Sequence, residues 1–169
     1  FVNFHKKQMP KNTHSLDVWL EKYVAKDLTA PQYNKIDNLL NYLKVRGINP
    51  TWYDFMYSPD IYFNFNQRLI IPFYWRGDVV GYTGRLFEAV EKVKYVTDVQ
   101  PGYVFNMDTQ DWTRKFVIVT EGPFDAITVS GVSILGSEIN DIQRELINNL
   151  NRQVIVVPDR DAPGEKLIN

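Results

Sequence analysis

The sequence contains no cysteine. This absence excludes disulfide bonds, thiolate zinc sites and cysteine nucleophiles within these 169 residues. Histidine is almost as scarce, because His5 and His14 are the only two in the chain. No other metal-ligating side chains surround them in the sequence, so a histidine metal site is a weak interpretation.

An excess of charge of one sign is also missing. The chain has 19 Lys and Arg against 20 Asp and Glu, a formal net charge of -1. Any binding to nucleic acid must therefore come from a local basic patch rather than from the overall charge. No apolar run is long enough to span a membrane, and the first residues do not resemble a signal peptide. A glycine-rich nucleotide loop of the Walker or dinucleotide type is absent as well.

Apolar and aromatic residues, by contrast, make up 44% and 14% of the chain, so a sizeable core is possible. We predict helices over 15–24 and 31–46, capped by Ser15 and Thr29, and the second helix ends at Gly47. A short helix is predicted over 51–57. Strands are predicted over 61–65, 68–75, 79–85 and 93–99, with a turn at 76–78. Residues 1–14 suggest a solvated entry, and residues 108–114 a polar linker.

From residue 115 the pattern changes to alternating strands and helices. Strands are predicted over 115–120, 132–135 and 153–157, and helices over 124–130 and 138–150, the latter capped by Ser137. This alternation favours a parallel sheet. The predicted fold class is α/β, with an α+β subdomain over residues 1–110 and a parallel sheet with flanking helices over 111–169. The chain opens without Met and stops as a helix is expected to begin, so we interpret it as a fragment.

Acidic residues follow two of the predicted parallel strands. Glu121 and Asp125 come after the strand at 115–120, and Asp159 and Asp161 after the strand at 153–157. Function in parallel sheets lies just past the carboxyl ends of the strands, and clustered carboxylates there suit Mg²⁺. Glu121 is interpreted as a metal ligand or a general acid or base. A simpler alternative is that Asp161 caps a helix and that Asp125 lies in the first turn of another.

Basic residues gather in the predicted β region. They alternate with apolar and aromatic residues and comprise Arg68, Arg76, Arg85, Lys92 and Lys94. Such groups could bind phosphate, or they could form the outward face of a half-exposed sheet. For Arg76, in the turn, the outward face is the preferred interpretation. For Arg85 and Lys94, the residues alone favour neither phosphate binding nor an outward-facing position over the other.

Two of the acidic segments resemble the motifs of the TOPRIM domain, Glu-Gly-Pro-Phe-Asp at 121–125 and Asp-Arg-Asp-Ala-Pro-Gly at 159–164. Further segments resemble, in the same order, the polymerase domain of DnaG-type bacterial and phage primases. These are Tyr-Leu-Lys-Val-Arg-Gly-Ile at 42–48, Arg-Leu-Ile-Ile-Pro-Phe at 68–73, the run at 77–85 that ends in Gly-Arg, Lys-Tyr at 94–95, and Leu-Gly-Ser at 135–137.

The resemblance implies a DNA primase core that makes short RNA primers on a template in a reaction dependent on Mg²⁺ or Mn²⁺. It implies catalytic roles for Glu121, Asp159 and Asp161, with Asp125 as a further metal ligand. Arg85 and Lys94 would contact nucleotide or template phosphates, and we place Arg68 with them. The expected partners are single-stranded DNA, ribonucleoside triphosphates and a replicative helicase, with no membrane. We expect a cytoplasmic protein of a bacterial or phage-infected cell.

The sequence departs from the primase pattern in three places. Thr97 stands where the family commonly has Asn, no zinc module precedes residue 1, and the chain ends before a further strand that TOPRIM sheets usually have. Two alternatives therefore stay open. One is another TOPRIM enzyme, such as an OLD-type nuclease, and the other is a non-catalytic nucleic-acid-binding replication module.

Overall fold

A computed structural model of the chain describes residues 2–160. These residues form two compact units, each assembled from separate stretches of sequence. The helical unit comprises Lys7–Pro72 and Gly81–Asp98, and the parallel-sheet unit comprises the chain up to Lys6, Phe73–Val80 and the chain from Val99 onward. The predicted division between residues 110 and 111 stays a prediction.

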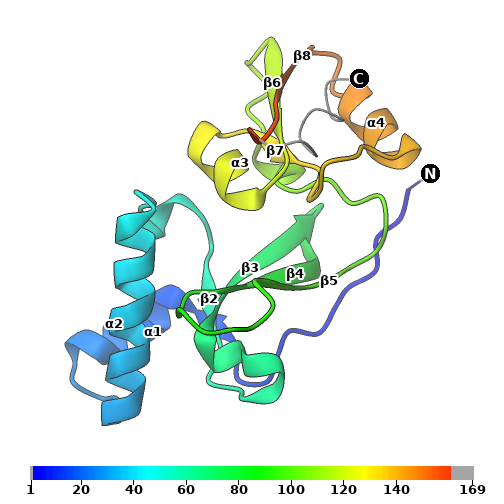
Figure 1. Cartoon of the computed structure of the whole chain (residues 1–169). Coiled ribbons are helices and arrows are strands. Elements are labelled where there is room, and N and C mark those ends of the chain that lie inside the picture. The colour runs from blue at the N-terminus through cyan, green and yellow to red at the C-terminus, as the bar shows by residue number, and fades with distance from the viewer. Residues whose placement is uncertain (1, 161–169) are drawn as a thin grey trace. The chain divides into compact units, whose positions relative to one another are not determined.

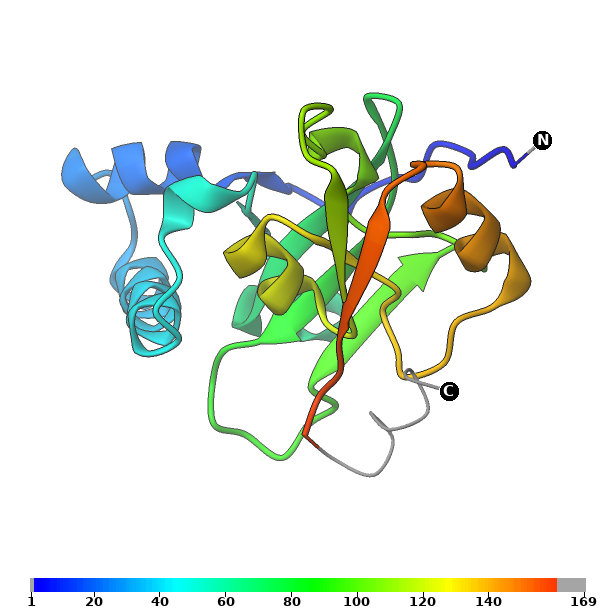
Figure 2. The same cartoon turned by 90° about the horizontal axis from the view of Figure 1, so that it is seen from above.

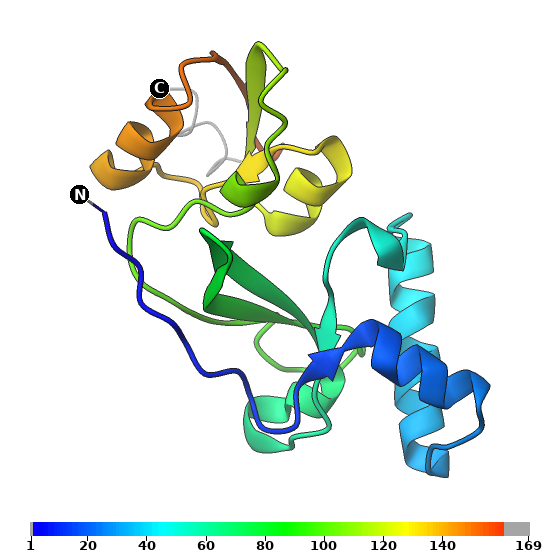
Figure 3. The ribbon, with the colours of Figure 1, turned by 180° about the vertical axis from the view of Figure 1, so that it is seen from behind.

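Two helices of the helical unit form as predicted from their caps. α1 spans Leu16–Val24, and the Ser15 side chain accepts a hydrogen bond from the Asp17 backbone N–H. α2 spans Ala30–Val45 and begins with a capping box between Thr29 and Gln32. The apolar stripe of α2 is buried, and Figure 3 shows α1 beside α2. Local signals therefore determine where both helices begin and end.

A five-stranded sheet has the order β1-β2-β3-β4-β5, and its first strand precedes α1 in the chain. Its strands are β1 His14–Ser15, β2 Met56–Tyr57, β3 Arg68–Trp75, β4 Asp78–Leu86 and β5 Tyr95–Val99. Arg76 and Gly77, both with positive φ, form the tight turn between β3 and β4. A turn with two positive-φ residues matches the right-handed twist of the two flanking strands. The turn predicted from Arg-Gly-Asp therefore forms here.

Two predicted elements of the helical unit are wrong. The predicted helix over 51–57 is only the 3-10 turn Pro50–Trp52, because Met56 instead pairs with Ile70 across β2 and β3. The predicted strand over 61–65 lies in the 3-10 segment Tyr62–Gln67, where Phe63 and Asn64 adopt left-handed backbone angles. Long-range pairing decides the first region, and positive φ angles exclude an extended strand in the second.

The second sheet is parallel and has the order β7-β6-β8. Its strands are β6 Phe116–Thr120, β7 Val132–Ser133 and β8 Gln153–Val157. Helix α3, Pro123–Val129, connects β6 to β7, and helix α4, Asp141–Asn148, connects β7 to β8. Figures 1 and 2 show α3 and α4 on opposite sides of this sheet. An antiparallel sheet followed by a parallel one confirms the predicted α/β class.

One local prediction in the parallel-sheet unit is wrong. α4 starts after Asn140, not Ser137, because Asn140 and Gln143 form a capping box. Residues 108–114 are more than a polar linker. They begin in the 3-10 turn η3, Met107–Thr109, and the Asp108 carboxylate accepts hydrogen bonds from both backbone N–H groups of the hairpin turn. Gln110 is buried and donates to backbone carbonyls at the end of α3.

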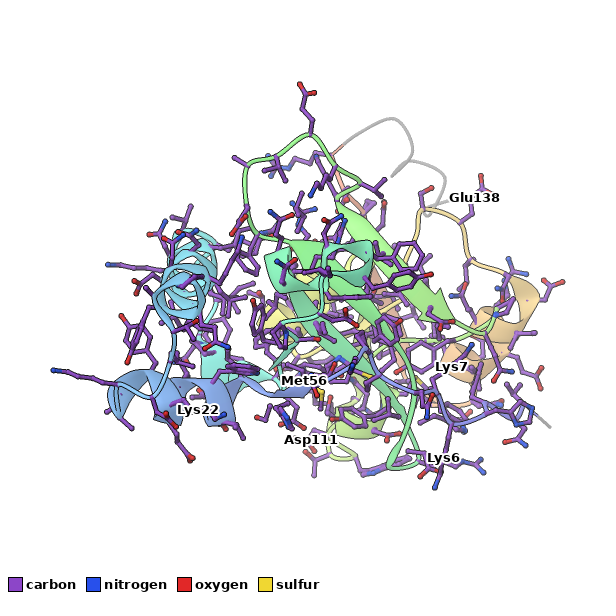
Figure 4. The ribbon with its side chains drawn as sticks, turned by 90° about the horizontal axis from the view of Figure 1, so that it is seen from below. Lys6, Lys7, Lys22, Met56, Asp111 and Glu138 are labelled. Atoms are coloured by element: carbon purple, nitrogen blue, oxygen red, sulfur yellow. The ribbon has the colours of Figure 1, made fainter. Side chains whose placement is uncertain are left out.

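The N-terminal segment packs against the rest of the chain and is not the solvated entry that was expected for residues 1–14. Phe4 is buried and packs edge-on against Trp75 and Tyr103. Lys6 forms an ion pair with Asp78 at 3.2 Å, and Lys7 forms one with Asp98 at 2.9 Å. Figure 4 labels both lysines along this segment. Exposed pairs of this kind contribute little free energy, so Phe4 is the main anchor.

Candidate metal and nucleotide site

Glu121 and Asp159 follow adjacent parallel strands, and the structure brings these two chain segments together. Thr120, at the end of β6, is in register with Val157 at the end of β8. The backbone N–H of Asp159 donates a hydrogen bond to Glu121 Oε1 at 3.1 Å. The expectation that the two acidic motifs meet at one edge of the sheet is therefore confirmed for these two residues.

The backbone that carries Glu121 is held firmly. Glu121 is buried, and the fully buried Ser133 donates from Oγ to the Glu121 carbonyl at 2.6 Å. Ser133 Oγ also accepts a hydrogen bond from the Leu135 N–H, which fixes the loop after β7. Thr120 Oγ1 lies 3.0 Å from the Gly122 carbonyl oxygen and donates toward it. Ser133 and Thr120 thus position the strand end, although neither stood out in the sequence.

Asp125 lies in the first turn of α3, where the simpler interpretation of this residue places it. A Cβ placed on Gly122 would lie 3.8 Å from Asp125 Oδ2, so this carboxylate lies close to the loop that follows Glu121. Asp125 itself is exposed. Its position suits both a metal ligand and a helix-end carboxylate, and its metal role stays a prediction.

Asp161 lies outside the residues that the structure describes. Within residues 2–160, no three His, Cys, Asp or Glu side chains form a group that could hold a metal ion. Glu121 and Asp159 nevertheless supply hard oxygen donors at adjoining strand ends. Mg²⁺ commonly uses only one or two protein carboxylates together with water and substrate phosphates. The chemistry of this donor set therefore fits a magnesium ion that arrives with a nucleotide.

Arg85 lies on β4 in the helical unit and is surrounded by aromatic rings. Its Nε donates to the Tyr42 hydroxyl at 2.8 Å, and its guanidinium lies 4.7 Å from the centre of the Tyr95 ring. Arg46 also lies over the Tyr42 ring, at 5.3 Å. Two guanidinium groups and two tyrosine rings therefore gather here, an arrangement that can contact both phosphates and bases.

Arg68 and Lys94 differ in burial, since Arg68 lies inside the helical unit and Lys94 on its surface. Arg68 is buried, and its guanidinium donates to four backbone carbonyls, including that of Lys94 at 3.1 Å. Burial, and then the charge of Arg85, lower the pKa of Arg68. Lys94 is exposed. The contacts of Arg68 favour a structural role, and its assignment as a nucleotide ligand stays a prediction.

Thr97, the departure from the primase pattern, has a clear local partner. Its Oγ1 lies 2.7 Å from Thr83 Oγ1 on the neighbouring strand β4. Cross-strand threonine pairs of this type stabilise antiparallel sheets. The substitution is therefore accommodated within the sheet.

No protein-family model matches the chain, and no curated protein matches it by sequence. Solved structures do match. The DnaG catalytic core superposes with a TM-score of 0.65 at 16% identity, covering 79% of this chain and 58% of that one. The zinc-binding and RNA polymerase domains of the Aquifex aeolicus primase give 0.66 at 22% identity, covering 76% and 44%. The DnaG catalytic domain bound to single-stranded DNA gives 0.65 at 16% identity, covering 79% and 57%.

The chain thus spans between 44% and 58% of the length of these three structures. In the part of the chain that the structure covers, no helix is long and apolar enough to cross a membrane. At identities this low, the superpositions show a shared fold and not a shared activity. The two sheets and their connecting helices have the fold of the DnaG-type primase catalytic core.

Proposed function

We propose that this chain is the catalytic-core part of a DnaG-type DNA primase, with its parallel sheet forming a TOPRIM domain. The observation that carries the proposal is the hydrogen bond from the Asp159 backbone to the Glu121 carboxylate, which joins the two acidic motifs within a primase-core fold. The proposed reaction is the template-directed joining of ribonucleotides into short RNA primers. Its partners would be single-stranded DNA, ribonucleoside triphosphates and a replicative helicase.

Glu121, Asp125, Asp159 and Asp161 would hold Mg²⁺ or Mn²⁺ in this proposal. When bound, the ion supplies charge neutralisation for the triphosphate and for the charge that develops during transfer. Glu121 would orient this ion or accept the proton of the primer 3′-hydroxyl, because its carboxylate is buried at the strand end. Ser133 holds the Glu121 backbone in place for either role. Arg85 and Lys94 would position template or nucleotide phosphates on the helical unit.

The first test is RNA synthesis on single-stranded DNA with labelled ribonucleotides, with and without Mg²⁺ or Mn²⁺. It should use this chain beside any longer protein that contains it. Asp159→Asn and Glu121→Gln should each lower synthesis by about a hundredfold or more, because they remove charge where the ion and triphosphate meet. Asp111→Asn, an exposed acid on the loop before β6 (Figure 4), should leave it unchanged.

Mn²⁺ binding, measured by electron paramagnetic resonance, gives a second result that does not depend on turnover. The Asp159→Asn variant should bind Mn²⁺ more weakly than the unchanged chain, and Asp111→Asn should not. Metal-dependent DNA cleavage without RNA products would replace the primase proposal with a nuclease. Salt-sensitive DNA binding, with neither synthesis nor metal binding in any of these proteins, would instead indicate a non-catalytic module.

A further inference from the structure

A hollow on the helical unit lies between helix α2 and the loop that follows β4. It has a volume of about 500 Å³, which is within the range of ordinary ligand pockets. Asn38, Asn41, Tyr42 and Val45 supply the α2 part of its lining, and residues 87–90 supply the rest. The four α2 residues are spaced at i, i+3, i+4 and i+7, so they occupy one face of the helix.

Two asparagine amides in this lining are available to a ligand. Asn38 is half-buried and Asn41 is exposed, and within residues 2–160 neither side chain forms a hydrogen bond with another residue. Each amide carries an acceptor oxygen beside a donor NH₂ group. Every nucleobase presents an adjoining donor and acceptor along its edge, so an amide can pair with a base through two hydrogen bonds.

The apolar part of the lining suits the faces of a flat ring. Val45 is 79% exposed and Val90 is 40% exposed, although both lie beside the buried Phe87 and the ring of Tyr42 in the hollow. A flat aromatic ligand would remove this apolar surface from water and could contact the tyrosine ring. Apolar walls with a few amide groups are therefore the environment in which proteins bind bases.

The charges beside the hollow favour a ligand that carries phosphate. Arg46 and Arg85 lie against Tyr42, with the Arg46 guanidinium 5.3 Å from the ring centre and Arg85 Nε 2.8 Å from the hydroxyl oxygen. Glu88 is the one carboxylate among the lining residues, and its side chain is only 14% exposed. It forms an ion pair with Lys35 at 2.6 Å, so its charge is offset within the unit. A phosphate beside Tyr42 therefore meets two guanidinium groups.

We propose that this hollow binds one nucleotide unit. The base lies against the apolar lining and pairs with the amides of Asn38 and Asn41, while its phosphate lies at Arg46 and Arg85. The inference deepens the proposed function, on which it rests for the phosphate contact of Arg85, and adds a base site to it. The nucleotide is either part of a single strand or free, because both forms present the same base and phosphate.

The test compares two fluorescein-labelled single strands of equal length, one with all four bases and one abasic, by fluorescence anisotropy in EDTA. The unchanged chain should bind the strand with bases about fivefold more tightly or better. Asn38→Ala and Asn41→Ala should each remove most of this difference and leave binding of the abasic strand unchanged. Arg46→Gln should weaken both strands alike. Asn34→Ala is the matched control, an exposed asparagine one turn earlier on α2 and outside the lining.

Calorimetric titration with ATP and with UTP, also in EDTA, identifies the source of the nucleotide. Binding of either one that Asn41→Ala weakens would show that a free nucleotide enters the hollow, whereas base-dependent binding of strands alone would assign it to a strand. Alanine favours the helix, so the asparagine variants should fold, which circular dichroism can verify.

Equal affinity for the two strands, or a base preference that survives both asparagine substitutions, would overturn the inference. RNA synthesis by the same proteins separates this failure from a failure of the proposed function. Synthesis without a base preference would overturn the hollow alone. A base preference that depends on Asn38 and Asn41, without any RNA product, would support the hollow and count against the primase reaction.

Discussion

At the scale of single residues, burial gives Arg68 a role that its charge alone would not suggest. Its guanidinium donates to the carbonyls of Phe63, Gly84, Val93 and Lys94, which come from three separate stretches of chain. A Cβ at Gly84 would lie 3.2 Å from Arg68 Cδ, so the Arg68 side chain packs tightly against this glycine. Arg68 therefore joins the 3-10 segment, β4 and the loop before β5 around one buried charge.

Replacing Arg68 tests whether this residue is structural. Arg68→Met keeps much of the apolar volume and removes all four hydrogen bonds, so we expect a loss of about 3 kcal/mol in the free energy of unfolding. Urea titration followed by tryptophan fluorescence measures this loss, with Arg76→Met in the exposed turn as the control. A variant that kept full stability but lost affinity for nucleotides would show that Arg68 is a ligand instead.

At the scale of elements, helix α3 approaches the parallel sheet unusually closely at its end. A Cβ on Gly131 would lie 2.5 Å from the Ile118 carbonyl oxygen of β6, a contact with backbone that cannot move aside easily. Asn106 and Gln110 donate hydrogen bonds to the Gly131 carbonyl from the other side. Gly131 therefore allows the chain at the end of α3 to pass directly over the backbone of β6.

Gly131→Ala should therefore destabilise the chain by about 3 kcal/mol, because α3 must shift away from β6 to make room. Gly136→Ala is the matched control, since a Cβ there would meet nothing within 4 Å. Thermal unfolding of both variants, followed by circular dichroism, compares them directly. Equal midpoints for the two variants would contradict the packing argument.

The sequence predicted those elements whose signals are local. α1 and α2 follow from apolar periodicity and caps, and the strand ends before Glu121 and Asp159 follow from abrupt changes in polarity. Pairings between distant segments were not visible, so the region of β2 was predicted as a helix. The buried partners of the site, such as Ser133, were also missed, because a serine inside a short apolar run carries no local signal of what it contacts.

At the scale of the whole molecule, the net charge of -1 gives no general attraction to nucleic acid. Any affinity for single-stranded DNA would have to come from local groups, and the helical unit gathers Arg46 and Arg85 with Tyr42 and Tyr95. The acidic strand ends that contain Glu121 and Asp159 belong to the other compact unit. Binding to DNA and binding to metal should therefore be separable in this protein.

We accordingly expect the chain to bind a labelled single-stranded DNA oligonucleotide in the presence of EDTA, with an affinity that falls as salt increases. Each phosphate contact removed should reduce the slope of log K against log salt by about 0.7, so Arg85→Ala and Lys94→Ala should each have roughly this effect. Lys22→Ala, on α1 (Figure 4), is the control for loss of a cation elsewhere on the helical unit. Titration at several salt concentrations gives the slopes. Slopes unchanged by the first two substitutions would show that neither Arg85 nor Lys94 contacts a DNA phosphate. Binding that required Mg²⁺ would show that DNA is held mainly by the acidic strand ends and their metal.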